Sequence, residues 1–401
     1  MTNAGLRKDS YIPARLTDLL AALGGQAQFA EAMRLVAAIF HYEAFAALEQ
    51  LKDLYFPLDP DRGAATAPPP EALARFEEAL TAVMVKANFE ETPFDELGRS
   101  AQASALNDLR LKTSPAGIAR IRFFSRGAHK TTLQRRRLVR KLAVEAEILD
   151  DVVLMVAFDT DEKTRNPKAF AHVRPGGVLL KHFRNVARHD LAALHPGAKP
   201  TMKRRDQLFL GVPALAGGVP LIMQLGVAIP VIFGVIAAYF GAGGVIDNDN
   251  LKKAIAAASG VIALGTFMMR QWVKYERQTL RYQKKLADTV YFHNAANNSG
   301  VLYGLIAAAE EQDVKEAALA YHALLAGGAM DKQALDKACE AFLREKLGFS
   351  VDFEIHDALG KLLRLNLVTQ DGDKYAAAPL PEALKRLDEA WDGIFKYAAA
   401  G

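Results

Sequence analysis

The most prominent pattern along this chain is a stretch without a charged side chain that extends from residue 207 to residue 246. A second charge-free run, residues 254–269, follows after a short polar connection. A bilayer core about 30 Å thick requires roughly 20 apolar residues in a helix. The two runs therefore predict a transmembrane hairpin over residues 207–272, with spans at about 220–242 and 253–272.

The cations around these runs predict how the hairpin is oriented. Lys203, Arg204 and Arg205 precede the first span, and six Lys and Arg residues follow the second between residues 270 and 285. Because cations accumulate on the cytoplasmic side, this distribution predicts an integral protein of a bacterial cytoplasmic membrane with both termini in the cytoplasm. The alternative is a buried helical hairpin in a soluble protein.

Before the hairpin, the pattern changes from helical to extended. Apolar residues recur every three or four positions over residues 11–55 and again over 71–88, which predicts helices. Three later stretches, at 117–125, 151–158 and 177–183, have the alternating or continuously apolar pattern of strands. We therefore expect an N-terminal helical region at 1–62 and a small mixed α/β domain at 71–206.

After the hairpin, we expect a juxtamembrane helix at 273–300 and a winged-helix-like domain at 301–401. Its helices are predicted at about 301–326, 331–346 and 352–366, with a final helix at 381–397. Two short strands flank Asp371-Gly372-Asp373, which is a typical hairpin turn. The predicted fold class is thus an α+β membrane protein, with the transmembrane hairpin between two folded regions.

Composition adds an uneven charge distribution. The 401 residues carry a net charge of +4. Between residues 199 and 285 there are twelve Lys and Arg against four Asp and Glu, whereas residues 286–401 have eleven against eighteen. The single cysteine, Cys339, excludes an intramolecular disulfide framework and predicts a buried, small apolar side chain.

Two basic clusters are the richest candidates for binding. One runs from Lys181 to Asp206 and contains three histidines, and the other, residues 120–141, holds nine Lys and Arg and no acidic residue. The histidine spacing does not match a metal pair, so we expect no metal site. Anionic lipid headgroups would suit the first cluster, and so would a role as a solvated flank of the membrane segment. The second cluster would suit nucleic acid or anionic lipid equally, and the nearby predicted spans favour lipid. No nucleotide-binding or hydrolase motif is present in the sequence, and we expect no catalytic residue and no cofactor.

The chain also resembles a known family. The resemblance extends over nearly the whole sequence, and its elements are Tyr11-x-Pro13-x-Arg15, Pro57-Leu58-Asp59-Pro60-Asp61, Ala87-Asn88-Phe89, Arg126-Gly127, Lys181-x-Phe183-x-Asn185, Asp190-x-x-x-Leu194-x-Pro196-Gly197, Met202-x-x-x-Asp206, Tyr291-Phe292, Asn297-Asn298-x-Gly300, Glu310-Glu311-Gln312, Lys315-Glu316-Ala317, Val351-Asp352-Phe353, Asp357-Ala358-Leu359 and Trp391-Asp392. In number and order they resemble the domain-of-unknown-function family 3754, which includes transmembrane protein 143 of organelles. The resemblance implies a two-span membrane protein with large soluble parts and no established activity.

The polar residues of these elements and of the adjoining basic cluster form the predicted binding surface. It comprises Arg126, Lys181, Arg184, Asn185, Asp190, Arg205 and Asp206. We expect this surface to contact anionic headgroups of the lipid bilayer.

The preferred hypothesis is a membrane-anchored, non-enzymatic adaptor with a basic lipid-facing surface and a C-terminal module that binds a protein partner. Two alternatives stay open: a homo-oligomeric channel or transporter component, and an enzyme acting on an anionic substrate at the membrane surface through Lys181, His189 and Asp190. Nucleic acid is not expected as a partner, because the winged-helix-like region is acidic and its third helix offers mainly Lys361 and Arg364.

Overall fold

The structure is a computed structural model that describes residues 9–24, 26–62, 68–93, 110–113, 117–137, 140–161, 173–201 and 248–394, together with seven single positions between 230 and 241. The chain divides into two compact units. The first contains Met1–Leu106, Pro115–Leu194 and His293–Gly401, and the second contains Asn107–Ser114 and His195–Phe292.

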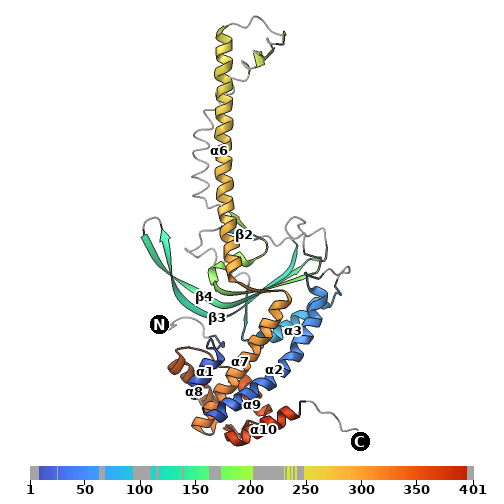
Figure 1. The fold of residues 1–401 in the computed structure, drawn as a ribbon, viewed down its shortest axis with the longest axis vertical. Coiled ribbons are helices and arrows are strands. Elements are labelled where there is room, and N and C mark those ends of the chain that lie inside the picture. The colour runs from blue at the N-terminus through green and yellow to red at the C-terminus, as the bar shows by residue number, and fades with distance from the viewer. Residues whose placement is uncertain are drawn as a thin grey trace. The chain divides into compact units, whose positions relative to one another are not determined.

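An antiparallel sheet of five strands forms the centre of the first unit (Figure 1). Its strands, in spatial order, are β1 (Glu90–Thr92), β3 (Ile118–Arg137), β4 (Arg140–Phe158), β5 (Val178–Ala187) and β7 (Asn294–Asn297). β4 is central, and its register places Leu154 opposite Phe123 of β3 and Lys181 of β5. Every residue from Val152 to Phe158 is buried, which explains why this strand is apolar on both faces.

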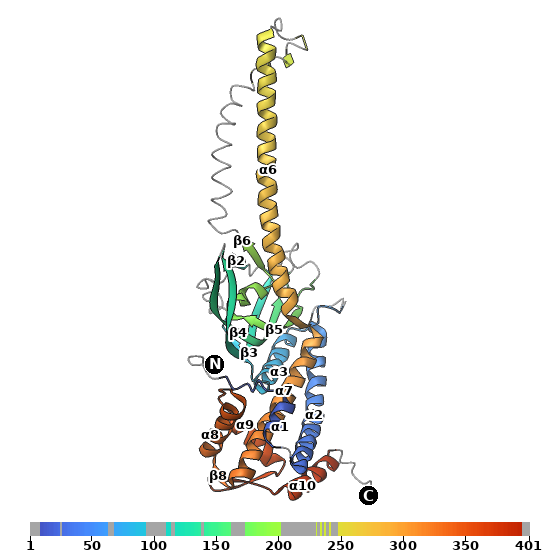
Figure 2. The same ribbon diagram turned by 60° about the vertical axis from the view of Figure 1, so that its left-hand side comes forward.

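Two helices of 29 residues each, α2 (Ala27–Tyr55) and α7 (Ser299–Gly327), lie side by side in Figures 1 and 2. They are antiparallel, because Phe29 near the start of α2 stacks on Tyr321 near the end of α7, with ring centroids 6.2 Å apart. Each helix contributes to two hydrophobic cores. The other helices of this unit that precede the sheet are α1 (Leu16–Ala22) and α3 (Ala72–Lys86).

The first core joins α1 and the early part of α2 to the late part of α7 and the C-terminal elements. The second core joins the end of α2, α3 and the early part of α7 to one face of the sheet, where Val153, Met155 and Ala157 of β4 are buried. Burying a large aliphatic side chain contributes about 1.5–3 kcal/mol, so both cores stabilise the pairing of α2 with α7.

After α7 the chain forms β8 (Met330–Asp331), α8 (Lys332–Phe342), α9 (Ile355–Arg364), β9 (Val368–Asp371), β10 (Lys374–Ala377) and α10 (Leu380–Asp392). The three strands pair in the order β8–β10–β9. We call β8 to α10 the winged-helix elements, after the expectation from the sequence. The predicted turn at Asp371-Gly372-Asp373 is confirmed, since Gly372 has a φ of 56° between the paired strands. Cys339 of α8 is buried, as its apolar character predicted.

The second unit contains a two-stranded sheet of β2 (Arg110–Thr113) and β6 (Ala198–Thr201), and the helix α6 (Asn248–His293), which continues into the first unit at its last residue. In Figure 1, α6 is a single continuous helix, and it comprises 46 residues.

The predicted transmembrane hairpin is wrong for the described residues. Of the helices in the described ranges, none combines the length and the apolar character needed to cross a bilayer. The second predicted span lies within α6, whose charge-free run of sixteen residues between Lys253 and Arg270 is shorter than the roughly 20 required. Most of the first span, 220–242, lies outside the described residues. The predicted location as an integral membrane protein is contradicted by the same finding, that no helix in the described ranges can cross a bilayer.

Replacing Gly127 with alanine should destabilise the protein by about 1–3 kcal/mol. Gly127 has a φ of +71°, and a Cβ atom there would lie 2.6 Å from Cβ of Asp150. Its amide also donates a hydrogen bond of 2.6 Å to Asp9. Urea unfolding measures the loss. Gly24→Ala is the control, because Gly24 also has a positive φ but no atom within 4 Å of its Cβ position, so an equal loss in both variants would contradict the steric explanation.

Candidate functional site

The buried carboxylate of Asp151 on β4 is the centre of a charged cluster in the first unit. Arg126 of β3 donates to its Oδ2 from Nε at 3.0 Å and from Nη2 at 2.8 Å. On the other oxygen, His182 Nε2 lies at 2.8 Å and Arg184 Nε at 3.3 Å. We call Asp151, Arg126, His182 and Arg184 the Asp151 cluster. The strand register explains why these side chains lie together, since Arg126 of β3 and Arg184 of β5 are both paired with Asp151 of β4.

The surroundings keep Asp151 ionised. Burial alone would raise the pKa of this carboxyl, but the hydrogen bond from His182 and the charge of Arg126 outweigh burial and hold the pKa well below its ordinary value. Asp151 and Arg126 are 4% and 7% exposed, so the pair is protected from solvent screening. The arrangement resembles a structural ion pair, in which two buried charges satisfy one another.

Two of the predicted binding residues, Arg126 and Arg184, therefore meet at Asp151. Lys181 is half-buried on β5, and burial lowers its pKa. Asn185 has a left-handed φ of 54° and an exposed side chain. Asp190 lies in a 3-10 helix, Arg188–Leu194, with its Oδ2 3.6 Å from His189 Nε2. In the part that the structure describes, no ion pair joins Lys181 to Asp190.

Arg205 and Asp206, the last two predicted residues, lie outside the described residues. The sequence did not single out Asp151 or His182 as binding residues. The alternation of β3 and β5 could have placed Arg126 and Arg184 on sheet strands, but the partner strand that supplies Asp151 depends on the sheet order.

Tyr11 connects the Asp151 cluster with helix α7. The guanidinium of Arg126 lies between the rings of Tyr11 and Phe89, at 4.3 and 4.6 Å from their centroids. The ammonium of Lys315 lies 5.8 Å from the centroid of the Tyr11 ring. Lys315 is buried on α7 and donates to the carbonyl of Ile12 at 3.2 Å. Cation–π contacts thus link the sheet, the N-terminal segment and α7.

Lys315 belongs to a group of polar side chains between the two hydrophobic cores. This α7 polar layer consists of Gln312, Asp313, Lys315 and Glu316. Oε1 of Glu316 accepts hydrogen bonds from Asn88 at 3.2 Å and from Gln312 at 3.0 Å. Asn88 adopts a φ of 56° and also donates to the carbonyl of Ser10 at 3.1 Å.

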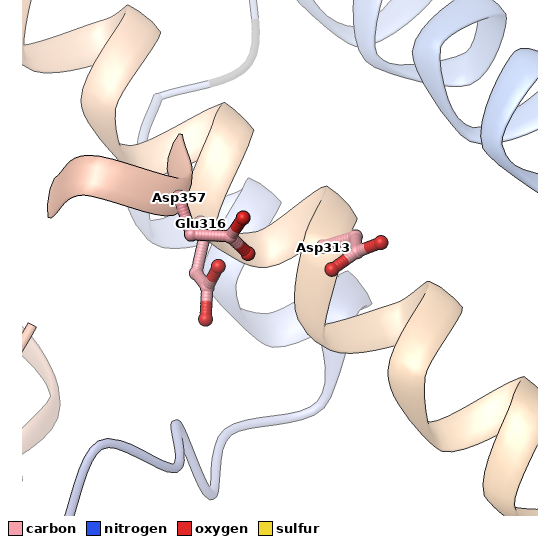
Figure 3. Close-up of side chains that lie close together, drawn as sticks. All are labelled: Asp313, Glu316 and Asp357. Carbon is pink, nitrogen blue, oxygen red and sulfur yellow. The ribbon is translucent and has the colours of Figure 1, made fainter. Parts of the chain in front are cut away.

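Asp313 and Glu316 also approach Asp357 of α9, and Figure 3 shows all three carboxylates. One oxygen of each lies within 4.8 Å of the others, as in a site for a divalent cation. The ammonium of Lys361 already contacts all three, at 2.5 Å from Asp313, 3.1 Å from Glu316 and 2.5 Å from Asp357. Because Lys361 supplies the cation, the residues fit an ion-pair cluster better than a metal site.

The charge states in this cluster are unusual. Burial raises the pKa of Glu316 to about 7, and the opposing effect of Lys361 is smaller. Burial raises the pKa of Asp313 as well. Burial alone would lower the pKa of Lys361, but the three carboxylates reverse this and raise it. Lys361 is therefore charged near pH 7, whereas Glu316 exchanges a proton there.

Both cations of helix α9 have acidic partners within the chain, Lys361 in a largely buried cluster and Arg364 at the surface. Lys361 binds the three carboxylates, and Arg364 Nη2 donates to Glu43 of α2 at 2.9 Å.

Helix α6 of the second unit differs, because its described side chains are mostly exposed. Large apolar residues recur at spacings of 4, 7, 7, 11 and 11 and form an apolar seam on one side of the helix: Leu251, Ile255, Ile262, Met269, Leu280 and Tyr291. Their side chains are between 42% and 77% exposed. Five exposed cations follow at spacings of 4, 3, 4 and 3 and form a basic stripe: Arg270, Lys274, Arg277, Arg281 and Lys284.

The seam and the stripe are neighbours on the helix surface. Leu280 of the seam has Arg277 three residues before it and Lys284 four residues after it, and such pairs lie side by side on a helix. None of the five cations of the stripe has an ion-pair partner among the described residues. Both patterns could have been read from the sequence, where Ile255, Ile262 and Met269 were instead assigned to the second membrane span.

Residues 149–300 match the model of a family described as Protein of unknown function (DUF3754). The match supports the predicted resemblance to this family and covers β5, β7, α6 and most of the buried part of β4. No solved structure matches the chain.

Replacing Asp151 with asparagine should destabilise the protein by about 3–5 kcal/mol, because Arg126 would remain buried without its counter-charge. A carboxyl with a depressed pKa stabilises the fold above its ordinary pKa of 3.8, and this contribution is lost as the pH falls below that value. Urea unfolding at pH 7 and at pH 3 should therefore show a smaller difference between wild type and Asp151→Asn at the lower pH. The exposed Asp53→Asn is the control, and an equally small effect of both substitutions at pH 7 would contradict the prediction.

Glu316 should make stability fall with rising pH near neutrality. Its folded pKa of about 7 exceeds the ordinary value of 4.5, so between these values the folded state binds more protons than the unfolded state. The free energy of unfolding should decrease by up to roughly 3 kcal/mol over this window. Glu316→Gln should flatten the profile, whereas Glu71→Gln, at an exposed position, should leave it unchanged. A wild-type profile that is flat between pH 4.5 and 7 would refute the assignment.

Proposed function

We propose that this protein is a non-enzymatic adaptor that binds a protein partner through helix α6. The observation that carries the proposal is the apolar seam of α6 with the basic stripe beside it, both exposed. Large exposed apolar surfaces commonly mark sites of interaction. An apolar seam with charged flanks is also how one helix recognises another in a coiled coil or a helical groove.

The charges specify the chemistry of the partner. The five cations of the basic stripe lie along one edge of the seam and outnumber the two exposed acidic residues near them, Glu276 and Asp288, so the partner should present an apolar surface with carboxylates along one border. Two α6 helices in parallel register would place their basic stripes against one another, which like-charge repulsion disfavours. The partner surface is therefore acidic and is not another α6 in parallel register.

The ion-pair clusters of the first unit support a non-enzymatic role. Asp151 is bonded to Arg126 and His182, and the three carboxylates near α7 are bonded to Lys361. These groups stabilise contacts between elements of the fold. Because Lys361 and Arg364 are both engaged, we also propose that the winged-helix elements serve protein contacts and not the reading of nucleic acid.

The finer resemblance to transmembrane protein 143 stays a prediction. The channel hypothesis depends on membrane spans, and it is withdrawn together with the hairpin.

A designed helical peptide with leucine along its seam and glutamate at the flanking positions should bind the full-length protein. Fluorescence anisotropy of the labelled peptide measures the affinity, and a peptide with lysine in place of glutamate is the negative control. Affinity should fall with added salt, because exposed charges are screened. Arg277→Glu with Arg281→Glu should weaken binding by roughly tenfold or more.

Two control variants separate the seam and the stripe from general effects. Lys337→Glu with Lys374→Glu changes the net charge equally at exposed positions of α8 and β10, and it should leave binding unchanged. Ile262→Asp should abolish binding, whereas Val85→Asp, at an equally exposed apolar position of α3, should not. Equal binding of the two peptides would overturn the proposal, as would vesicles of anionic lipid that compete with the acidic peptide and bind more tightly than it does.

A further inference from the structure

A groove opens between helices α2, α3 and α7 of the first unit. It has a volume of about 480 Å³, within the range of roughly 300–1,000 Å³ that is usual for binding sites. Small side chains keep the helices from filling it, among them Ala47 of α2, Ala82 of α3 and Ala309 of α7. Larger apolar groups, including Leu51, Leu54 and Ile306, complete its apolar surface.

Charged groups border this three-helix groove, and carboxylates predominate. Four acidic residues line it, Glu43, Glu78, Glu310 and Asp313, against two cations, Arg75 and Lys86. Glu43 and Asp313 are paired with Arg364 and Lys361 of α9, and Glu310 lies 3.0 Å from Nδ1 of His41, but a carboxylate accepts about four hydrogen bonds and retains capacity for a further cation. Glu78 is exposed and has no ion-pair partner among the described residues.

We propose that the three-helix groove binds helix α6 of a second copy of this chain. The inference rests on the proposed function, because it identifies the acidic partner of α6. The two surfaces complement one another: the groove has an apolar floor with a mainly acidic border, and α6 has an apolar seam with a basic border. Binding of an amphipathic helix in an apolar groove is a common mode of protein recognition.

The net charges of the helices concerned are complementary as well. Helix α6 carries eight Lys and Arg against three Asp and Glu, whereas helices α2, α3 and α7 together carry ten acidic residues against five basic ones. Oppositely charged surfaces on one chain accelerate and orient association between copies.

Such an interface joins two different surfaces, so it is heterologous. Each copy keeps a free α6 or a free groove after one contact has formed, and association can continue into rings or longer assemblies. This property distinguishes the contact from a symmetric dimer, in which both partners use the same surface.

Sedimentation velocity of the full-length protein over a range of concentrations tests the inference. The wild type should form assemblies whose size increases with concentration and decreases with salt. Ala82→Arg places a large cation in the groove at an exposed position of α3, and it should yield a monomer. Val85→Arg, three residues further along α3 and outside the groove lining, is the matched control and should associate like the wild type.

A mixing experiment provides the decisive result. Ala82→Arg retains its α6, and Arg277→Glu with Arg281→Glu retains its groove. Each variant alone should be monomeric, whereas an equimolar mixture should form a heterodimer that does not grow further. A wild type that stays monomeric, association that Ala82→Arg leaves intact, or a mixture that stays monomeric would overturn the inference.

The outcomes also separate this inference from the proposed function. If the acidic peptide binds α6 while the wild type stays monomeric, the adaptor role stands and the second copy is not the partner. If the peptide does not bind α6, the proposed function fails first, and the inference that rests on it fails with it.

Discussion

The first unit depends on the antiparallel pairing of α2 with α7. These two helices contribute to both hydrophobic cores, and the α7 polar layer lies where one core ends and the other begins. A buried polar group must find partners or cost several kcal/mol, so this layer specifies what packs around it. Glu316 requires Asn88, Gln312 and Lys361, and Lys315 requires the carbonyl of Ile12.

Through these contacts, segments far apart in the sequence are held at one place. The N-terminal segment is fixed by Lys315 and by Arg126, whose guanidinium also stacks on Tyr11. Arg126 in turn is bonded to Asp151 at the centre of the sheet. A continuous set of charged and aromatic contacts therefore connects the winged-helix elements, through α7, with the central strands. We regard these residues as the framework of the protein, and α6 as the surface on which its function depends.

The contrast between the two kinds of charge follows from solvation. The buried charges of the first unit, such as Asp151, Arg126 and Glu316, have lost water and compensate for this loss with close partners, so they have little capacity for an external ligand. The cations of α6 remain hydrated and unpaired within the described residues, which leaves them available to a partner. Removal of the adjacent apolar seam from water lowers the free energy and therefore favours binding.

The sequence alone determined the local elements. Helical periodicity predicted α2, α3, α7 and α9, strand patterns predicted the first part of β3 and most of β5, and Asp371-Gly372-Asp373 located a hairpin, because these features depend on neighbours within a few residues. Only the tertiary structure decided which distant residues meet: Arg126 and His182 at Asp151, and Lys361 at Glu316, since sheet order and helix packing bring them together. The charge-free run at residues 254–269, which lies within α6, led to the wrong prediction of a membrane span for the same physical reason. Apolar side chains signal only that a surface avoids water, and whether a bilayer or another protein surface covers it depends on helix length and on the charges that lie beside the seam in three dimensions.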